Sequence, residues 1–99
     1  MTLADFPAIG DKEIIMKAIR HYGMSQQMLM AIEEMSELTK ALCKDFRNTK
    51  GARGQIVEEM ADVYIMLAQL EIILDAQNDL YEIVDQKLAR LEKRMEDSV

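Results

Sequence analysis

The sequence has few of the residues that interrupt helices or crosslink chains: four glycines, one proline and one cysteine among 99 residues. A single cysteine excludes an intrachain disulfide and is typical of a reducing compartment, so we expect a cytoplasmic protein. Cys43 lies on the apolar side of a predicted helix, and we expect it in the core. Tryptophan is absent and only two Phe and three Tyr occur, so aliphatic residues and nine methionines must form the core.

Positive charge is also scarce, with 12 Lys and Arg against 18 Asp and Glu and a formal net charge of −6. Proteins that bind nucleic acid polymers neutralise phosphates with clustered Lys and Arg, so this composition argues against a DNA or RNA partner. An acidic chain can still bind a nucleotide when a divalent metal supplies positive charge. Asp5 interrupts the N-terminus before a signal peptide develops, and the apolar stretch 63–74 is too short to span a bilayer. We therefore expect no membrane association.

The glycines and the proline divide the chain into an N-terminal arm and four predicted helices. We expect an irregular arm at residues 1–10 and a single all-α domain, bundle-like, at residues 11–99. Asp11 and Ser25 are the predicted N-caps of the first two helices, and Gly23 ends the first of them. The segment 47–54 predicts a loop, and the third helix is expected at 55–76. Asn78 or Asp79 is expected to begin the fourth.

Apolar residues repeat at helical spacing on the second and fourth predicted helices, and these stripes are expected to face the core. The stripe of the second helix comprises Met28, Ile32, Met35, Leu38, Leu42 and Phe46, and that of the fourth comprises Leu80, Val84, Leu88, Leu91 and Met95.

The third predicted helix differs from the others because it is apolar on almost all sides. Between Ala61 and Leu74 its polar side chains are Asp62, Gln69 and Glu71, with Tyr64 amphipathic. A helix of this kind must be covered on more than one side, and three neighbours in so short a chain do not suffice. We therefore expect dimerisation through this helix, as a homodimer or a dimer of dimers.

Carboxylate pairs spaced by three residues occur four times, so the spacing alone does not indicate a functional site. The helix face that each pair occupies distinguishes a candidate site from a solvated surface. At about 100° per residue, Glu34 falls inside the apolar arc of the second helix, Glu37 at its edge and Glu33 toward solvent. On the third helix, Glu59 and Asp62 also lie on a face formed by apolar residues. The pairs of the fourth helix, formed by Asp79, Glu82 and Asp85, point away from its apolar stripe and predict a solvated face.

The two inward-facing pairs should meet if the second and third helices form an antiparallel hairpin. Glu37 and Glu59 lie eleven residues on either side of residue 48, and Glu34 and Asp62 lie fourteen residues on either side of it. Both pairs therefore lie at matching heights. Four carboxylates on one patch would repel one another, and a group of oxygen ligands without His or Cys suits Mg²⁺ or Mn²⁺. The sequence predicts a metal site formed by Glu34, Glu37, Glu59 and Asp62.

These segments resemble a known family. Residues 33–37 (EEMSE) followed by residues 58–63 (EEMADV) are similar to the ExxE…ExxD motifs of the MazG-like all-α nucleoside triphosphate pyrophosphohydrolases, and the resemblance covers residues 12–95. It implies Mg²⁺-dependent hydrolysis of a nucleoside or deoxynucleoside triphosphate to the monophosphate and pyrophosphate. Glu34, Glu37, Glu59 and Asp62 match the metal ligands of the family.

The resemblance also implies roles for other residues. Lys87 matches a basic residue that approaches the phosphates, and Arg90 and Arg94 are further candidates on the same helix. Either Glu37 or Glu33 could act as the general base. The motifs do not specify the base or the sugar of the substrate. Two alternatives are a phosphoribosyl-ATP pyrophosphohydrolase, which shares the acidic motifs, and a non-catalytic helical dimer with a regulatory or scaffold role.

Overall fold

The computed structural model describes residues 11–46 and 52–98, and all regular structure within these ranges is helical. Four helices follow one another along the chain: α1 (Lys12–Tyr22), α2 (Met24–Phe46), α3 (Ala52–Ile73) and α4 (Gln77–Asp97). The expected all-α fold with four helices is therefore confirmed. The predicted N-terminal arm, residues 47–51 of the predicted loop and Val99 lie outside the described residues.

Local signals in the sequence explain the ends of α1. The Asp11 carboxylate accepts hydrogen bonds from the backbone N–H groups of Glu13 and Ile14, as expected of an N-cap. Gly23 adopts a φ of 92°, which favours glycine, and its N–H donates to the carbonyl of Ile19.

Four predicted helix boundaries are wrong. Ser25 is not the N-cap of α2, because the Gly23 carbonyl already accepts the hydrogen bond of the Gln27 N–H and α2 begins at Met24. The third helix begins at Ala52, so its N-terminal turn includes Gly54, and it ends at Ile73 rather than at residue 76. The fourth begins at Gln77 after Ala76, which makes no side-chain cap hydrogen bond.

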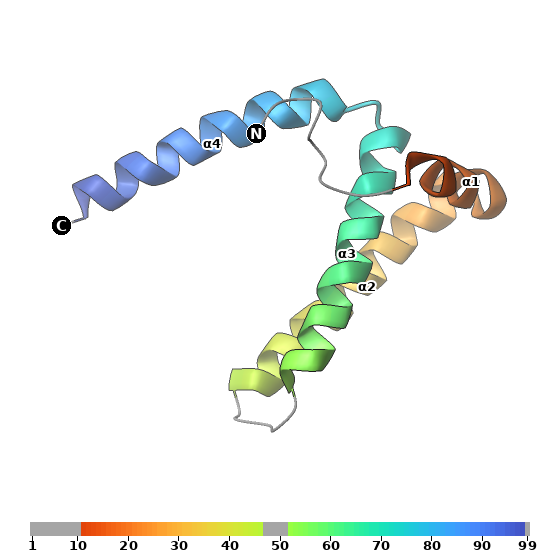
Figure 1. Cartoon of the computed structure of the whole chain (residues 1–99), viewed down its shortest axis with the longest axis horizontal. Coiled ribbons are helices and arrows are strands. Elements are labelled where there is room, and N and C mark those ends of the chain that lie inside the picture. The colour runs from red at the N-terminus through yellow and green to blue at the C-terminus, as the bar shows by residue number, and fades with distance from the viewer. Residues whose placement is uncertain (1–10, 47–51, 99) are drawn as a thin grey trace.

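The helices form a hairpin with one helix packed on its end and another extending from it. Helices α2 and α3 lie antiparallel along most of their length and make the most extensive interhelical contact (Figure 1). Helix α1 packs across the end of the hairpin that lies away from the α2–α3 connection. There Ile15 and Ile19 form a small core with Ala68, against which Ile72 and Ile73 pack.

The face of α2 that packs on α3 is not the one that its largest apolar residues predict. Ala31 and Ala41 are buried and Leu38 is half-buried, whereas four residues of the predicted stripe are exposed: Met28, Ile32, Met35 and Leu42. Small side chains allow the backbones of two helices to approach closely, so alanine occupies the contact. Cys43 is likewise exposed rather than in the core. Helix α2 thus has a second, uncovered apolar face.

Helix α4 extends away from the hairpin (Figure 1) and has no buried residue. Its predicted stripe includes Leu88 and Leu91, which are 54% and 49% exposed. The radius of gyration is 16.0 Å, compared with about 13 Å for a compact chain of this length. One chain therefore does not close into the bundle-like domain that the sequence predicts. None of the described helices combines the length and apolar character needed to cross a membrane.

Among the residues that the structure describes, three polar side chains are buried: Gln27, Gln69 and Glu71. The two glutamines are partners, since Gln27 Nε2 donates to Gln69 Oε1 across the α2–α3 contact at 2.8 Å. Glu71 differs, because it is only 6% exposed and its Oε1 has no hydrogen-bond partner among the described residues. Burial raises the pKa of the Glu71 carboxyl above its ordinary value, because desolvation penalises the charged form.

We expect Glu71→Gln to raise the free energy of unfolding near pH 7 by about 1–2 kcal/mol. Because the pKa of Glu71 is raised on folding, the unfolded chain ionises first as the pH rises above about 4.5. The free energy of unfolding of the wild type therefore decreases with rising pH until the pH passes the pKa of Glu71 in the folded chain. The variant has no carboxyl group at this position, so its free energy of unfolding does not decrease in this way. Urea titrations between pH 4 and pH 8 at fixed protein concentration measure the difference. The exposed Glu82→Gln serves as control, and equal pH profiles for Glu71→Gln and wild type would contradict the expectation.

Candidate metal centre

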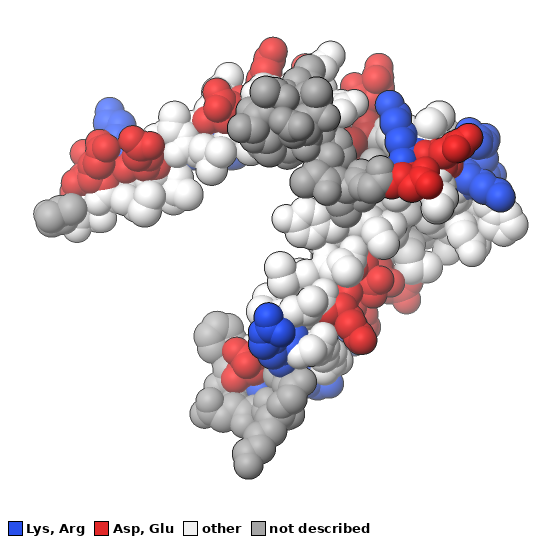
Figure 2. Space-filling model, in the orientation of Figure 1, with Lys and Arg blue, Asp and Glu red and all other residues white. Residues whose placement is uncertain are grey.

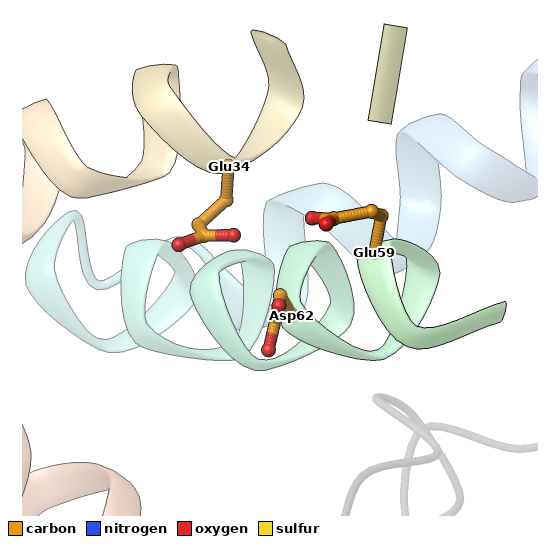
Figure 3. Close-up of side chains that lie close together, drawn as sticks. All are labelled: Glu34, Glu59 and Asp62. Atoms are coloured by element: carbon orange, nitrogen blue, oxygen red, sulfur yellow. The ribbon is translucent and has the colours of Figure 1, made fainter. Parts of the chain in front are cut away.

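Three carboxylates from two helices converge partway along the α2–α3 hairpin. Glu34 projects from α2 toward α3, and Glu59 and Asp62 come from successive turns of α3 (Figure 3). One oxygen from each of the three carboxylates lies within 4.8 Å of the other two. Glu34 and Glu59 are half-buried and Asp62 is exposed, so the group is open to solvent on one side. The sequence predicts this convergence from the spacing of the acidic pairs about residue 48.

The electrostatics of the cluster are unfavourable without a cation. The pKa of Glu34 is raised above its ordinary value, first by desolvation and then by the negative charges of neighbouring carboxylates, of which Asp62 and Glu59 act most strongly. The Oε2 atom of Glu59 is buried and has no hydrogen-bond partner in the part of the chain that the structure describes. Within the described residues, no Lys or Arg is ion-paired with any of the three carboxylates. A positive charge between them would relieve both the repulsion and the unpartnered oxygen.

The donor set fits a hard divalent cation. Mg²⁺ and Mn²⁺ prefer oxygen ligands, and Mg²⁺ usually combines one or two protein carboxylates with water and substrate phosphates. Ligand oxygens on adjacent or opposite sides of an octahedral Mg²⁺ ion lie about 3–4.2 Å apart. The observed oxygens all lie within 4.8 Å of one another, a spacing close to this range. Glu34, Glu59 and Asp62 are therefore the residues that would hold the ion.

The fourth predicted ligand, Glu37, lies outside this group. Its side chain is exposed, and its Oε1 accepts a hydrogen bond from Lys40 Nζ at 3.3 Å, one turn further along α2. Glu33, the other candidate base, is also exposed. Both glutamates contribute negative charge that raises the pKa of Glu34, so both act electrostatically on the cluster. The structure thus brings three of the four predicted ligands together.

The predicted phosphate-binding residues are not brought to the carboxylates within one chain. Lys87, Arg90 and Arg94 are all exposed on α4, which extends away from the hairpin (Figure 1). Asp79, Glu82 and Asp85 are exposed as predicted. Figure 2 shows that charged side chains of α4 gather on one side of the helix, while uncharged side chains follow the other side.

Comparison with known proteins identifies no relative: no protein-family model matches the sequence, and neither a curated protein nor a solved structure does.

We expect millimolar Mn²⁺ or Mg²⁺ to raise the melting temperature by at least about 5 °C relative to the protein in EDTA. An ion that binds only the folded chain adds about 2.7 kcal/mol at 100 times its dissociation constant, and each kcal/mol raises the melting temperature of a small domain by about 4–8 °C. Thermal unfolding followed by circular dichroism measures the shift. Asp85→Asn, which alters an acid remote from the cluster, should respond as the wild type does. A melting temperature that neither ion changes would count against the site.

Proposed function

We propose that the protein is a Mg²⁺-dependent pyrophosphohydrolase that cleaves a nucleoside or deoxynucleoside triphosphate to the monophosphate and pyrophosphate. The convergence of Glu34, Glu59 and Asp62 from two antiparallel helices carries the proposal. An acidic protein requires a cation to accommodate a triphosphate, and these carboxylates supply the ligands for one. The resemblance of residues 33–37 and 58–63 to the MazG-like motifs supports the reaction class. We place the enzyme in the cytoplasm, because its single cysteine suits a reducing compartment.

We propose that the three clustered carboxylates would hold the metal ion and that an exposed glutamate accepts the proton of the attacking water. A bound Mg²⁺ ion would supply positive charge that neutralises the phosphate oxygens. Glu34, Glu59 and Asp62 are the residues that would hold it. Glu37 or Glu33, each exposed next to Glu34 on α2, accepts a proton from the attacking water. Lys87, Arg90 and Arg94 neutralise charge on the phosphates.

We further propose that the active form is a homodimer or a dimer of dimers. Three uncovered apolar surfaces support this: the outer face of α2, the sides of α3 that face neither α1 nor α2, and the stripe of α4. They include Ile32, Tyr64 and Leu88, all exposed in the single chain. An apolar surface of this extent on a folded protein marks an interaction site. The same assembly allows α4 of a second copy to bring Lys87 and Arg94 to the carboxylates.

Pyrophosphate release tests the proposed reaction directly. The protein is incubated with the common ribo- and deoxyribonucleoside triphosphates and with phosphoribosyl-ATP, with Mg²⁺ or with EDTA. We expect Mg²⁺-dependent release of pyrophosphate and the nucleoside monophosphate from at least one triphosphate, and none in EDTA. Release of orthophosphate instead would contradict cleavage between the α and β phosphates.

The other outcomes of this experiment separate the alternatives. Turnover confined to phosphoribosyl-ATP would assign the chain to the second enzyme class. No turnover of any substrate, from protein that is folded and associated, would support a non-catalytic helical dimer.

A further inference from the structure

A hydrogen bond between two buried amides connects α2 and α3 away from the carboxylates. Gln27 Nε2 donates to Gln69 Oε1 at 2.8 Å, and the residues are 6% and 2% exposed. The second amide atom of Gln69 is also engaged, since its Nε2 donates to Met66 Sδ at 3.7 Å. The pair is therefore enclosed in the helix contact, where water is not available to replace either partner.

This amide pair lies in the same register as the metal site. Gln27 and Gln69 are twenty-one residues on either side of residue 48, the position about which Glu34 and Asp62 are also symmetric. Each glutamine is seven residues from the acid on its own helix. Seven residues are two helical turns, or about 10.5 Å, and return a side chain to within about 20° of the same direction. The two layers therefore occupy the same faces of α2 and α3.

Apolar burial alone does not choose this register. Residues on almost every side of α3 are apolar, so rotating it or sliding it along α2 would exchange one apolar contact for another. A buried amide pair does discriminate, because a slip of one turn would separate Gln27 from Gln69 and leave both without partners. Single buried polar residues fix register in coiled coils for the same reason.

We propose that the Gln27–Gln69 hydrogen bond sets the register and rotation of α3 against α2, and thereby holds Glu34 opposite Glu59 and Asp62. The two glutamines are positioning residues, two turns from the ligands that they align. The effect on metal binding rests on the proposed function. The effect on helix register does not depend on it.

The paired variant Gln27→Met/Gln69→Met tests the assignment, because Met is similar in size to Gln and keeps the contact apolar. Spin labels at Gln26→Cys and Arg53→Cys, in a Cys43→Ser background, report the register, since both sites are exposed and lie at opposite ends of the hairpin. Labelled protein is diluted with unlabelled protein, and double electron–electron resonance gives the distance within one chain.

Without the substitutions at 27 and 69, we expect a single narrow distance. In the paired variant we expect retained helical circular dichroism and either a broadened distribution or a second maximum displaced by about 5 Å or more, one helical turn. Its Mn²⁺ affinity, measured from the resonance of free Mn²⁺, should fall at least tenfold. The matched control Gln55→Met/Gln86→Met alters two exposed amides and should change neither measurement.

An unchanged narrow distance in the paired variant would overturn the proposal. If that variant does not fold, Gln69→Met alone is measured in the same way. Loss of the helical signal in both would show that the amides are required for folding itself, which also overturns a role confined to register. Failure of the wild type to bind Mn²⁺ would reject the proposed metal centre, while the distance measurement would still decide the role of the glutamines.

Discussion

Glu34→Gln should reduce Mg²⁺-dependent pyrophosphate release by about 100- to 1,000-fold while leaving the helical content unchanged. A catalytic metal contributes several kcal/mol to stabilising a phosphoryl-transfer transition state, and each 1.36 kcal/mol corresponds to a factor of ten in rate. Glu34 is the only carboxylate that α2 contributes to the three-residue cluster, so its loss leaves both remaining ligands on α3. Glutamine has almost the same volume, and the fold should therefore persist.

The stability of the same variant provides an independent test of the site. Desolvation and the charges of Asp62 and Glu59 raise the pKa of Glu34. Removing that charge should raise the melting temperature in EDTA and abolish further stabilisation by Mn²⁺. Asp85→Asn should leave both activity and melting temperature near wild-type values. Combining Glu34→Gln with Glu59→Gln should cost little more activity than either alone, because both act through one ion. Near-normal activity of Glu34→Gln would reject the metal centre.

The parts of the fold that local chemistry determines are predictable from the sequence. The Asp11 carboxylate caps the start of α1, and Gly23 ends the helix because glycine tolerates the positive φ found there. The buried face of α2 is not predictable in this way, because the contact with α3 uses Ala31 and Ala41 while larger apolar residues remain exposed. Hydrophobicity ranks Met28 and Ile32 above alanine, but close approach of two helices requires small side chains. That requirement appears only when the partner helix is in place.

The candidate site likewise has a part that the sequence predicts and a part that it does not. The convergence of Glu34 with Glu59 and Asp62 follows from helical periodicity and hairpin symmetry, both of which can be read from the sequence. The position of the Glu37 side chain does not follow from periodicity or symmetry, because Glu37 accepts a competing hydrogen bond from Lys40. Gln27 and Gln69 were recognisable in principle by the same symmetry about residue 48. A glutamine carries no charge to mark it, however, and its burial became apparent only in the packed hairpin.

The position of α4 predicts a large effect of substitutions in its apolar stripe on association of the chains. Leu88 and Leu91 of its stripe are 54% and 49% exposed in the single chain, so substitutions at these two positions would hardly alter the stability of a monomer. In a dimer the same residues would be covered, and charge there would be costly. The apolar stripe of α4 therefore distinguishes a monomer from an assembly more sharply than any residue in the core.

Leu88→Lys/Leu91→Lys should weaken association at least about tenfold and reduce pyrophosphate release with it. Two charges placed in a covered apolar contact cost several kcal/mol, more than the 1.4 kcal/mol that a tenfold change in affinity requires. The matched variant Gln86→Lys/Ala89→Lys adds the same two charges to the opposite side of α4 and should behave as the wild type.

Sedimentation equilibrium from nanomolar to micromolar concentration measures association, and the pyrophosphate-release assay is repeated at each concentration. If the wild type sediments as a monomer, or if both double variants associate equally well, α4 does not form the interface. Recovery of activity when the Leu88→Lys/Leu91→Lys protein is concentrated enough to associate would tie the active site to the assembly, as expected if Lys87 and Arg94 reach the carboxylates from a second copy.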